Sequence, residues 1–103
     1  MKANKEYNSF ADFYPFYLGQ HAVRLNRRLH FFGTLAVICL VIAALLLWQW
    51  LLSLAVPFAG YGFAWVGHFF VEKNKPATFT YPVYSLMGDF VMFWQMLTGK
   101  IPF

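Results

Sequence analysis

A long run without charge constrains this chain more than any other feature of its sequence. Residues 31–71 contain no Lys, Arg, Asp or Glu, whereas about 20 helical residues suffice to cross the hydrocarbon core of a bilayer. The run is therefore long enough to cross, turn and return. Hydrophobic residues make up 60% of the chain and charged residues only 12%, which is typical of membrane proteins. We expect a single-domain, all-α integral membrane protein over residues 1–103.

The turn of this helical hairpin is expected near residues 49–53. A turn at Pro57 or later would leave a return arm that is too short to span a bilayer. This placement predicts transmembrane helices over residues 31–50 and 53–71. Trp48 and Trp50 would then lie at the far membrane interface, where amphipathic aromatic rings are favoured.

Basic residues flank the hairpin on one side only. They are Arg24, Arg27, Arg28, Lys73 and Lys75. Because cytoplasmic segments are enriched in Lys and Arg, both ends of the hairpin are predicted to be cytoplasmic, in the inner membrane if the chain is bacterial. The same asymmetry accounts for the net charge of +4, so we expect membrane lipid as a partner and no nucleic acid. The sequence leaves open whether the chain forms a homo-oligomer.

Two further helices are expected outside the uncharged run. Residues 11–29 carry apolar and aromatic positions with arginines toward the end, which predicts an interfacial amphipathic helix. Residues 82–97 predict a third helix, transmembrane or re-entrant, with Pro82 in its first turn and Gly99 just past its end. Its less apolar positions form one narrow stripe that includes Asp89. An acid in so apolar a helix is expected to face protein or water.

The return helix ends in the polar pattern HFFVE. His68 and Glu72 are four residues apart and therefore lie on one helical face. Three interpretations are open: two metal ligands, one ligand with the group that orients it, or a hydrogen-bonded pair without chemistry. The spacing does not choose among them.

The other two histidines are nine residues apart. On an unbroken helix His21 and His30 would be separated by about 13 Å and half a turn, so they can share one ion only if the helix breaks between them. Asn26 precedes His30 by four residues and is a candidate to orient its ring. Imidazoles with a carboxylate and without thiolate suit non-haem Fe(II) or Zn. Haem ligation by paired histidines is a further alternative.

Four blocks of the sequence resemble a known family. They read FYPFYLGQH, NRRLHFFG, GYGFAWVGHFFVEKNKPATF and PVYSLMGDFVMFW. They are similar to a small membrane-protein family whose characterised fungal member is an iron(II)-dependent 2-hydroxy fatty acid dioxygenase, and the resemblance covers about residues 10–97. It implies an enzyme with Fe(II) as cofactor that uses O2 to shorten a long-chain 2-hydroxy fatty acid by one carbon.

Carried over residue by residue, the resemblance also implies a site. The implied iron ligands are His21, His30 and His68, with the acid of the same block at Glu72. Supporting or substrate-binding roles are expected around them for Asn26, Lys73, Asn74, Lys75 and Asp89. The two lysines are expected to attract the substrate carboxylate. The competing interpretation is a non-enzymatic membrane protein, in which the histidines are interfacial and the small residues pack helices or a partner chain.

Overall fold

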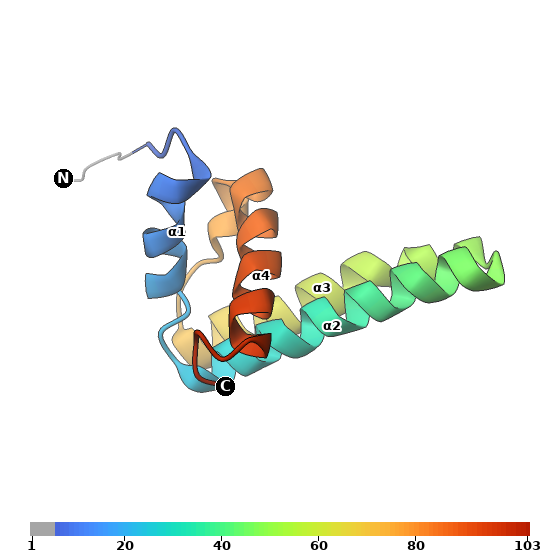
Figure 1. The fold of residues 1–103 in the computed structure, drawn as a ribbon. Coiled ribbons are helices and arrows are strands. Elements are labelled where there is room, and N and C mark those ends of the chain that lie inside the picture. The colour runs from blue at the N-terminus through green and yellow to red at the C-terminus, as the bar shows by residue number, and fades with distance from the viewer. Residues whose placement is uncertain (1–5) are drawn as a thin grey trace.

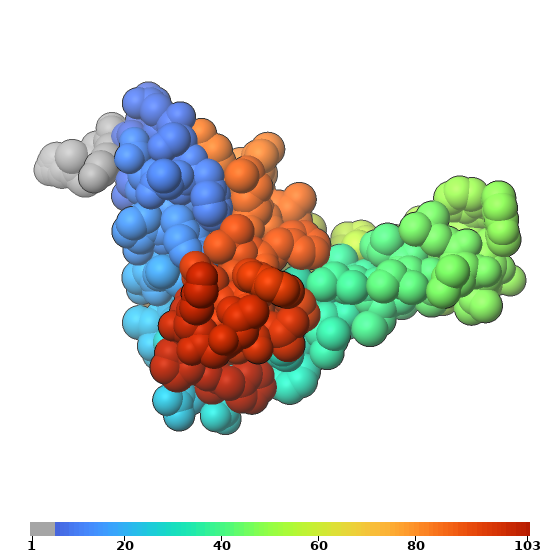
Figure 2. Space-filling view, in the orientation of Figure 1, coloured from blue at the N-terminus to red at the C-terminus, as the bar shows by residue number. Residues whose placement is uncertain are grey.

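The computed structural model describes residues 6–103, and these residues form helices and connecting segments without any strand. In chain order the elements are α1 (Phe10–Gly19), α2 (Arg24–Leu47), η1 (Trp50–Leu54), α3 (Ala55–Val66), the π-helical η2 (Gly67–Glu72), η3 (Ala77–Phe79) and α4 (Pro82–Leu97). α2 and α3 form a long hairpin, and α1 and α4 lie side by side across its base (Figure 1). The hairpin projects from this compact head (Figure 2), and the molecule measures 50 × 26 × 26 Å.

The hairpin has the apolar length that the uncharged run predicts. Two helical stretches, Arg24–Leu47 and Trp50–Glu72, are long and apolar enough to cross a membrane. α2 ends at Leu47, and Trp48 adopts the left-handed conformation with φ of 53°. The segment between α2 and α3 therefore covers residues 48–54 and includes the expected turn at 49–53, and the first arm begins earlier than residue 31.

Small residues let the two arms of the hairpin approach closely. A Cβ added at Gly33 would lie 2.9 Å from Cβ of Phe63, and one at Gly60 would lie 3.3 Å from Cγ2 of Val37. Glycine at these positions removes the side chain that would separate the backbones, which permits close helix approach. The hairpin is thus packed along one seam.

The continuous helix expected over residues 11–29 is interrupted in the structure. α1 ends at Gly19 and α2 begins at Arg24, so the connection redirects the chain from the head into the hairpin. This break corrects the expectation of a single interfacial helix. It also meets the condition under which His21 and His30 can face each other.

Side chains bind the backbone groups that this break exposes. Arg27 Nη1 donates to the carbonyl oxygens of His21 and Ala22 at 3.2 and 2.9 Å. The carboxylate of Glu72 accepts the amide hydrogen of Val23 at 2.6 Å. Helix ends leave such groups without intrahelical partners, and an acid at a helix N-terminus also complements the helix dipole. The break is therefore stabilised from both sides.

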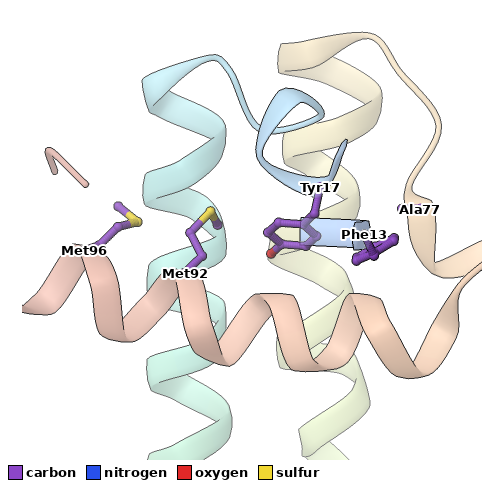
Figure 3. Close-up of a cluster of buried hydrophobic side chains, with 5 residues drawn as sticks. All are labelled: Phe13, Tyr17, Ala77, Met92 and Met96. Atoms are coloured by element: carbon purple, nitrogen blue, oxygen red, sulfur yellow. The ribbon is translucent and has the colours of Figure 1, made fainter. Parts of the chain in front are cut away.

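The core of the head lies between α1, α4 and the hairpin. Its buried side chains are Phe13, Tyr17, Ala77, Met92 and Met96 (Figure 3). α4 covers residues 82–97, the range that the sequence predicts, and its polar stripe faces α1. Tyr17 donates a hydrogen bond to Asp89, and Tyr14 donates one to Gln95. The expectation that Asp89 faces protein is confirmed.

Candidate metal centre

Three histidines from three segments meet at the base of the hairpin. His21 lies in the connection after α1, His30 in the second turn of α2, and His68 in η2. Their side chains are 1%, 4% and 3% exposed, and a ligand nitrogen of each lies within 4.8 Å of the others. The hypothesis that a helix break brings His21 to His30 is confirmed. The group is placed to hold one metal ion.

Hydrogen bonds determine which nitrogen of His21 and His30 carries the proton. His21 Nδ1 lies 2.6 Å from the carbonyl oxygen of Tyr17, and His30 Nδ1 lies 3.0 Å from that of Asn26. A carbonyl oxygen only accepts, so both Nδ1 atoms donate and both neutral rings leave Nε2 as a bare lone pair. These two Nε2 atoms are 3.1 Å apart. Two lone pairs that face each other at this distance favour a cation between them.

His68 is held in the same way by a side chain. Its Nδ1 lies 2.7 Å from Oδ1 of Asn74, whose Nδ2 donates to the carbonyl of Gln20 at 3.0 Å. Because the amide nitrogen of Asn74 is engaged with Gln20, its oxygen faces the imidazole and accepts the Nδ1 proton. Nε2 of His68 is therefore bare as well. Metal-binding histidines characteristically donate their other ring N–H to an oxygen in this manner.

The π-helical geometry of η2 and the glycine at its start position His68. A Cβ at Gly67 would lie 1.8 Å from Oδ1 of Asn26, so only glycine fits here. Short π-helical segments are frequent at functional sites because they reset the direction of the following side chains. Asn26 is completely buried and its side-chain amide has no hydrogen-bond partner within the described chain. It was expected to orient His30 through its side chain, whereas the structure uses its backbone carbonyl.

Three other expected site residues are not part of the histidine group. Among residues 6–103, the group of side chains that could hold a metal ion consists of the three histidines alone. The carboxylate of Glu72 accepts a hydrogen bond from the Val23 amide instead. Lys73 and Lys75 are exposed, and Lys75 lies over the ring of Phe79. The expected roles of Glu72 as a ligand and of the lysines in substrate binding stay predictions.

A cavity of about 570 Å³ opens beside the histidines. Small-molecule sites typically measure roughly 300–1,000 Å³. Its polar wall comprises Tyr17, His21, His30, Thr34, His68, Ser85 and Asp89, and most of the remaining lining is apolar. Sequence reasoning missed Tyr17 and Thr34, whereas Ser85 lies on the polar stripe of α4 that was expected to face protein. Of the two, Tyr17 carries a sequence signal, because it precedes His21 by four residues near the end of a helix.

The surroundings of His21 in the polar wall favour the uncharged form of its imidazole ring. The ring of Tyr17 stacks on His21 at 4.1 Å between centroids, and its hydroxyl donates to Oδ1 of Asp89 at 2.5 Å. Burial, followed by the neighbouring His30, lowers the pKa of His21 well below its usual range. Burial raises the pKa of Asp89 to about 6, against the opposing hydrogen bond from Tyr17. His21 is therefore neutral near pH 7, as a metal ligand must be.

Fold and site together define a class of protein: a helical hairpin with the length and apolarity of a membrane span, and a buried three-histidine site beside an apolar cavity. The family model described as 2-hydroxy-palmitic acid dioxygenase Mpo1-like matches residues 7–101. The chain belongs to this Mpo1-like family, which agrees with the resemblance found in its sequence. Comparisons with curated proteins and with solved structures return no significant match.

Proposed function

We propose that this chain is an Fe(II)-dependent membrane dioxygenase that uses O2 to shorten long-chain 2-hydroxy fatty acids by one carbon. The observation that carries the proposal is the convergence of three histidines whose Nδ1 protons are all bound to oxygens, beside a largely apolar cavity. The description of the family supports the same substrate class.

The donor set fits a non-haem iron ion. Three neutral imidazole nitrogens without a thiolate suit Fe(II) and leave other positions open. When bound, Fe(II) would supply the coordination positions for O2 and for the hydroxyl and carboxylate of the substrate. The chain holds the three rings through the carbonyl oxygens of Tyr17 and Asn26 and the amide oxygen of Asn74. Such partners fix ring orientation and increase ligand basicity.

The cavity suits the two ends of the proposed substrate. Its polar wall lies where the histidines converge, and its apolar lining matches an acyl tail and excludes water from the reacting head. The overall reaction balances as a 2-hydroxy acid plus O2 giving the acid one carbon shorter, CO2 and water. The original carboxyl carbon leaves as CO2, the hydroxyl-bearing carbon becomes the new carboxyl carbon, and O2 is reduced.

We further propose that the hairpin spans a bilayer while α4 lies along its surface. α4 has 16 residues, fewer than the roughly 20 that a span requires, and it runs across the hairpin (Figure 1). It exposes a continuous apolar face formed by Val83, Leu86, Met87, Phe90, Trp94 and Leu97. Such a face is typical of a helix embedded at the interface.

The orientation of the hairpin can be tested by labelling. The basic residues near both ends favour the cytoplasmic side for the head. In a chain with Cys39 replaced, a cysteine at the exposed position of Lys73 should react only with reagent on the cytoplasmic side. Reaction only from the opposite side would overturn the orientation without affecting the proposed chemistry.

The catalytic proposal is tested by iron reconstitution. Protein purified without a histidine tag and loaded anaerobically with Fe(II) should retain about one iron per chain. It should then consume O2 with 2-hydroxyhexadecanoate but not with hexadecanoate, which lacks the chelating hydroxyl. Stoichiometric iron without substrate-dependent O2 uptake would contradict the reaction. Failure to retain any metal would favour the non-enzymatic interpretation.

A further inference from the structure

The cavity is elongated along one face of α3 and η2. The residues that line it there recur at intervals of three and four, namely Pro57, Gly60, Tyr61, Ala64, Trp65 and His68. From His68 back to Pro57 this face extends about 16 Å at the helical rise per residue. One leaflet of a bilayer core is about 15 Å thick, half of the full hydrocarbon thickness. The face therefore has the length of one leaflet's acyl chains.

Polar and apolar groups are segregated along this length. The three histidines, Tyr17 and Asp89 gather at one end, whereas Gly60 and Ala64 form a narrow strip of small residues leading away from them. Ser85 also lines the cavity, and its buried hydroxyl has no hydrogen-bond partner within the described chain. A buried hydroxyl of this kind favours a polar group of a ligand. The arrangement matches a molecule with one polar head and one long tail.

The rim of the cavity is apolar and exposed. Tyr61 and Trp65 of α3 are 48% and 41% exposed, and Val83, Leu86 and Phe90 of α4 are 67%, 59% and 41% exposed. No lysine or arginine among residues 6–103 lines the cavity. An exposed apolar rim of this kind is unfavourable in water but continuous with the acyl phase of a membrane. The opening therefore suits entry from lipid.

We propose that the gap between α3 and α4 is a lateral entrance through which a single fatty acyl chain passes from the leaflet into the cavity. The tail then lies along α3, parallel to the surrounding lipid tails, and the strip of Gly60 and Ala64 sets the space available to it. This inference rests on the proposed function for the identity of the head group. It adds the route of entry and the residues that select tail length.

Substitution in the strip tests the selection of tail length. Ala64→Phe places a large ring in the channel, whereas Gly62→Phe is a matched control, because a Cβ at Gly62 has nothing within 4 Å and Gly62 does not line the cavity. The ratio of kcat/KM for 2-hydroxyhexadecanoate to that for 2-hydroxyoctanoate should fall about tenfold or more in the Ala64 variant. It should not change in the control. Equal effects on both chain lengths would overturn the channel.

A binding measurement separates this inference from the proposed reaction. In a chain whose Trp48, Trp50 and Trp94 are replaced by Phe, the remaining Trp65 lines the cavity and reports its occupancy. Dibromostearic acid in nanodiscs should quench Trp65 saturably, and Ala64→Phe should abolish the saturable component. A chain that keeps only Trp94 should show non-saturable quenching from lipid partition.

The outcomes of the two measurements are distinguishable. Saturable quenching of Trp65 without turnover on any 2-hydroxy acid would leave the channel standing and contradict the proposed reaction. Turnover with only non-saturable quenching of Trp65 would contradict the channel and leave the reaction standing.

Discussion

The two ends of the hairpin are built on different principles. At the base, His30, Gly67 and His68 are buried and each makes a specific contact. At the far end, Leu46 and Trp48 are 76% and 79% exposed, and their apolar surface is what a bilayer would cover. The far arm therefore needs only hydrophobicity and length, whereas the base needs particular atoms at particular places. Substitutions should be tolerated at the far end and not at the base.

The largest expected effect is the loss of metal on removal of one histidine. His21→Ala, His30→Ala and His68→Ala should each lose stoichiometric iron and O2-dependent turnover, because each removes one of three protein ligands. Elemental analysis and circular dichroism should show metal loss with helical content retained. Leu46→Ala in the far arm is the control and should keep both metal and activity. Wild-type iron content in all three histidine variants would refute the site.

The next largest effect is on fold stability, and it is measured by replacing each of two glycines in the same arm with alanine. Gly67→Ala should destabilise the fold by about 1–3 kcal/mol, because its methyl group would overlap Oδ1 of Asn26. Gly62→Ala adds its methyl to open space and should stabilise the helix by about 0.5–1 kcal/mol. Unfolding in mixed detergent micelles measures both. Equal changes in the two variants would show that the base is no more tightly packed than the arm.

A second substitution identifies the contact responsible. Asn26→Ala removes the amide that Gly67→Ala would meet, so the double variant should recover part of the stability lost by Gly67→Ala alone. The double variant should also bind metal, because the backbone carbonyl of Asn26 still accepts from His30. Strictly additive losses would place the cause of the Gly67 effect elsewhere.

The third effect depends on pH and comes from Asp89. Its pKa is raised by burial from 3.8 to about 6, so its contribution to stability is complete below about pH 4 and is lost as the pH rises through about 6. Asp89→Asn keeps an acceptor for Tyr17 and has no such dependence. The variant should therefore gain stability relative to the parent between pH 4 and 7, by about 3 kcal/mol. A pH-independent difference would contradict the burial of the charge.

The smallest effect is a change in iron affinity on substitution of Glu72, and it shows whether this residue is a ligand or positions the ligands. Glu72→Gln keeps an oxygen for the Val23 amide but removes the charge at the start of α2. If Glu72 positions the histidine-bearing segments, iron affinity should fall about tenfold while stoichiometric iron is still reached at saturation. A complete loss of iron, equal to that of His68→Ala, would show that the carboxylate is a ligand.

The hairpin and α4 could be predicted from local patterns. The length of the uncharged run requires two apolar arms, and Pro82 and Gly99 bracket α4 at its observed ends. The polar stripe of α4 predicts that Asp89 faces protein, because its spacing depends only on the helical period. Each of these predictions sums properties of neighbouring residues along the chain. The expected turn at residues 49–53 lies between the end of α2 at Leu47 and the start of α3 at Ala55.

The sequence by itself therefore determined an apolar hairpin, an acid turned toward protein, and histidines of the type that bind a metal ion. Only the tertiary structure decided that the three histidines meet, because that depends on the break after Gly19 and on the contact of Gly67 with Asn26. It also assigned Glu72 to the Val23 amide, a pairing of residues far apart in the chain. Hydrophobicity and helical period act between near neighbours and can be read in sequence order. Convergence of distant side chains depends on how whole helices pack, which no local pattern specifies.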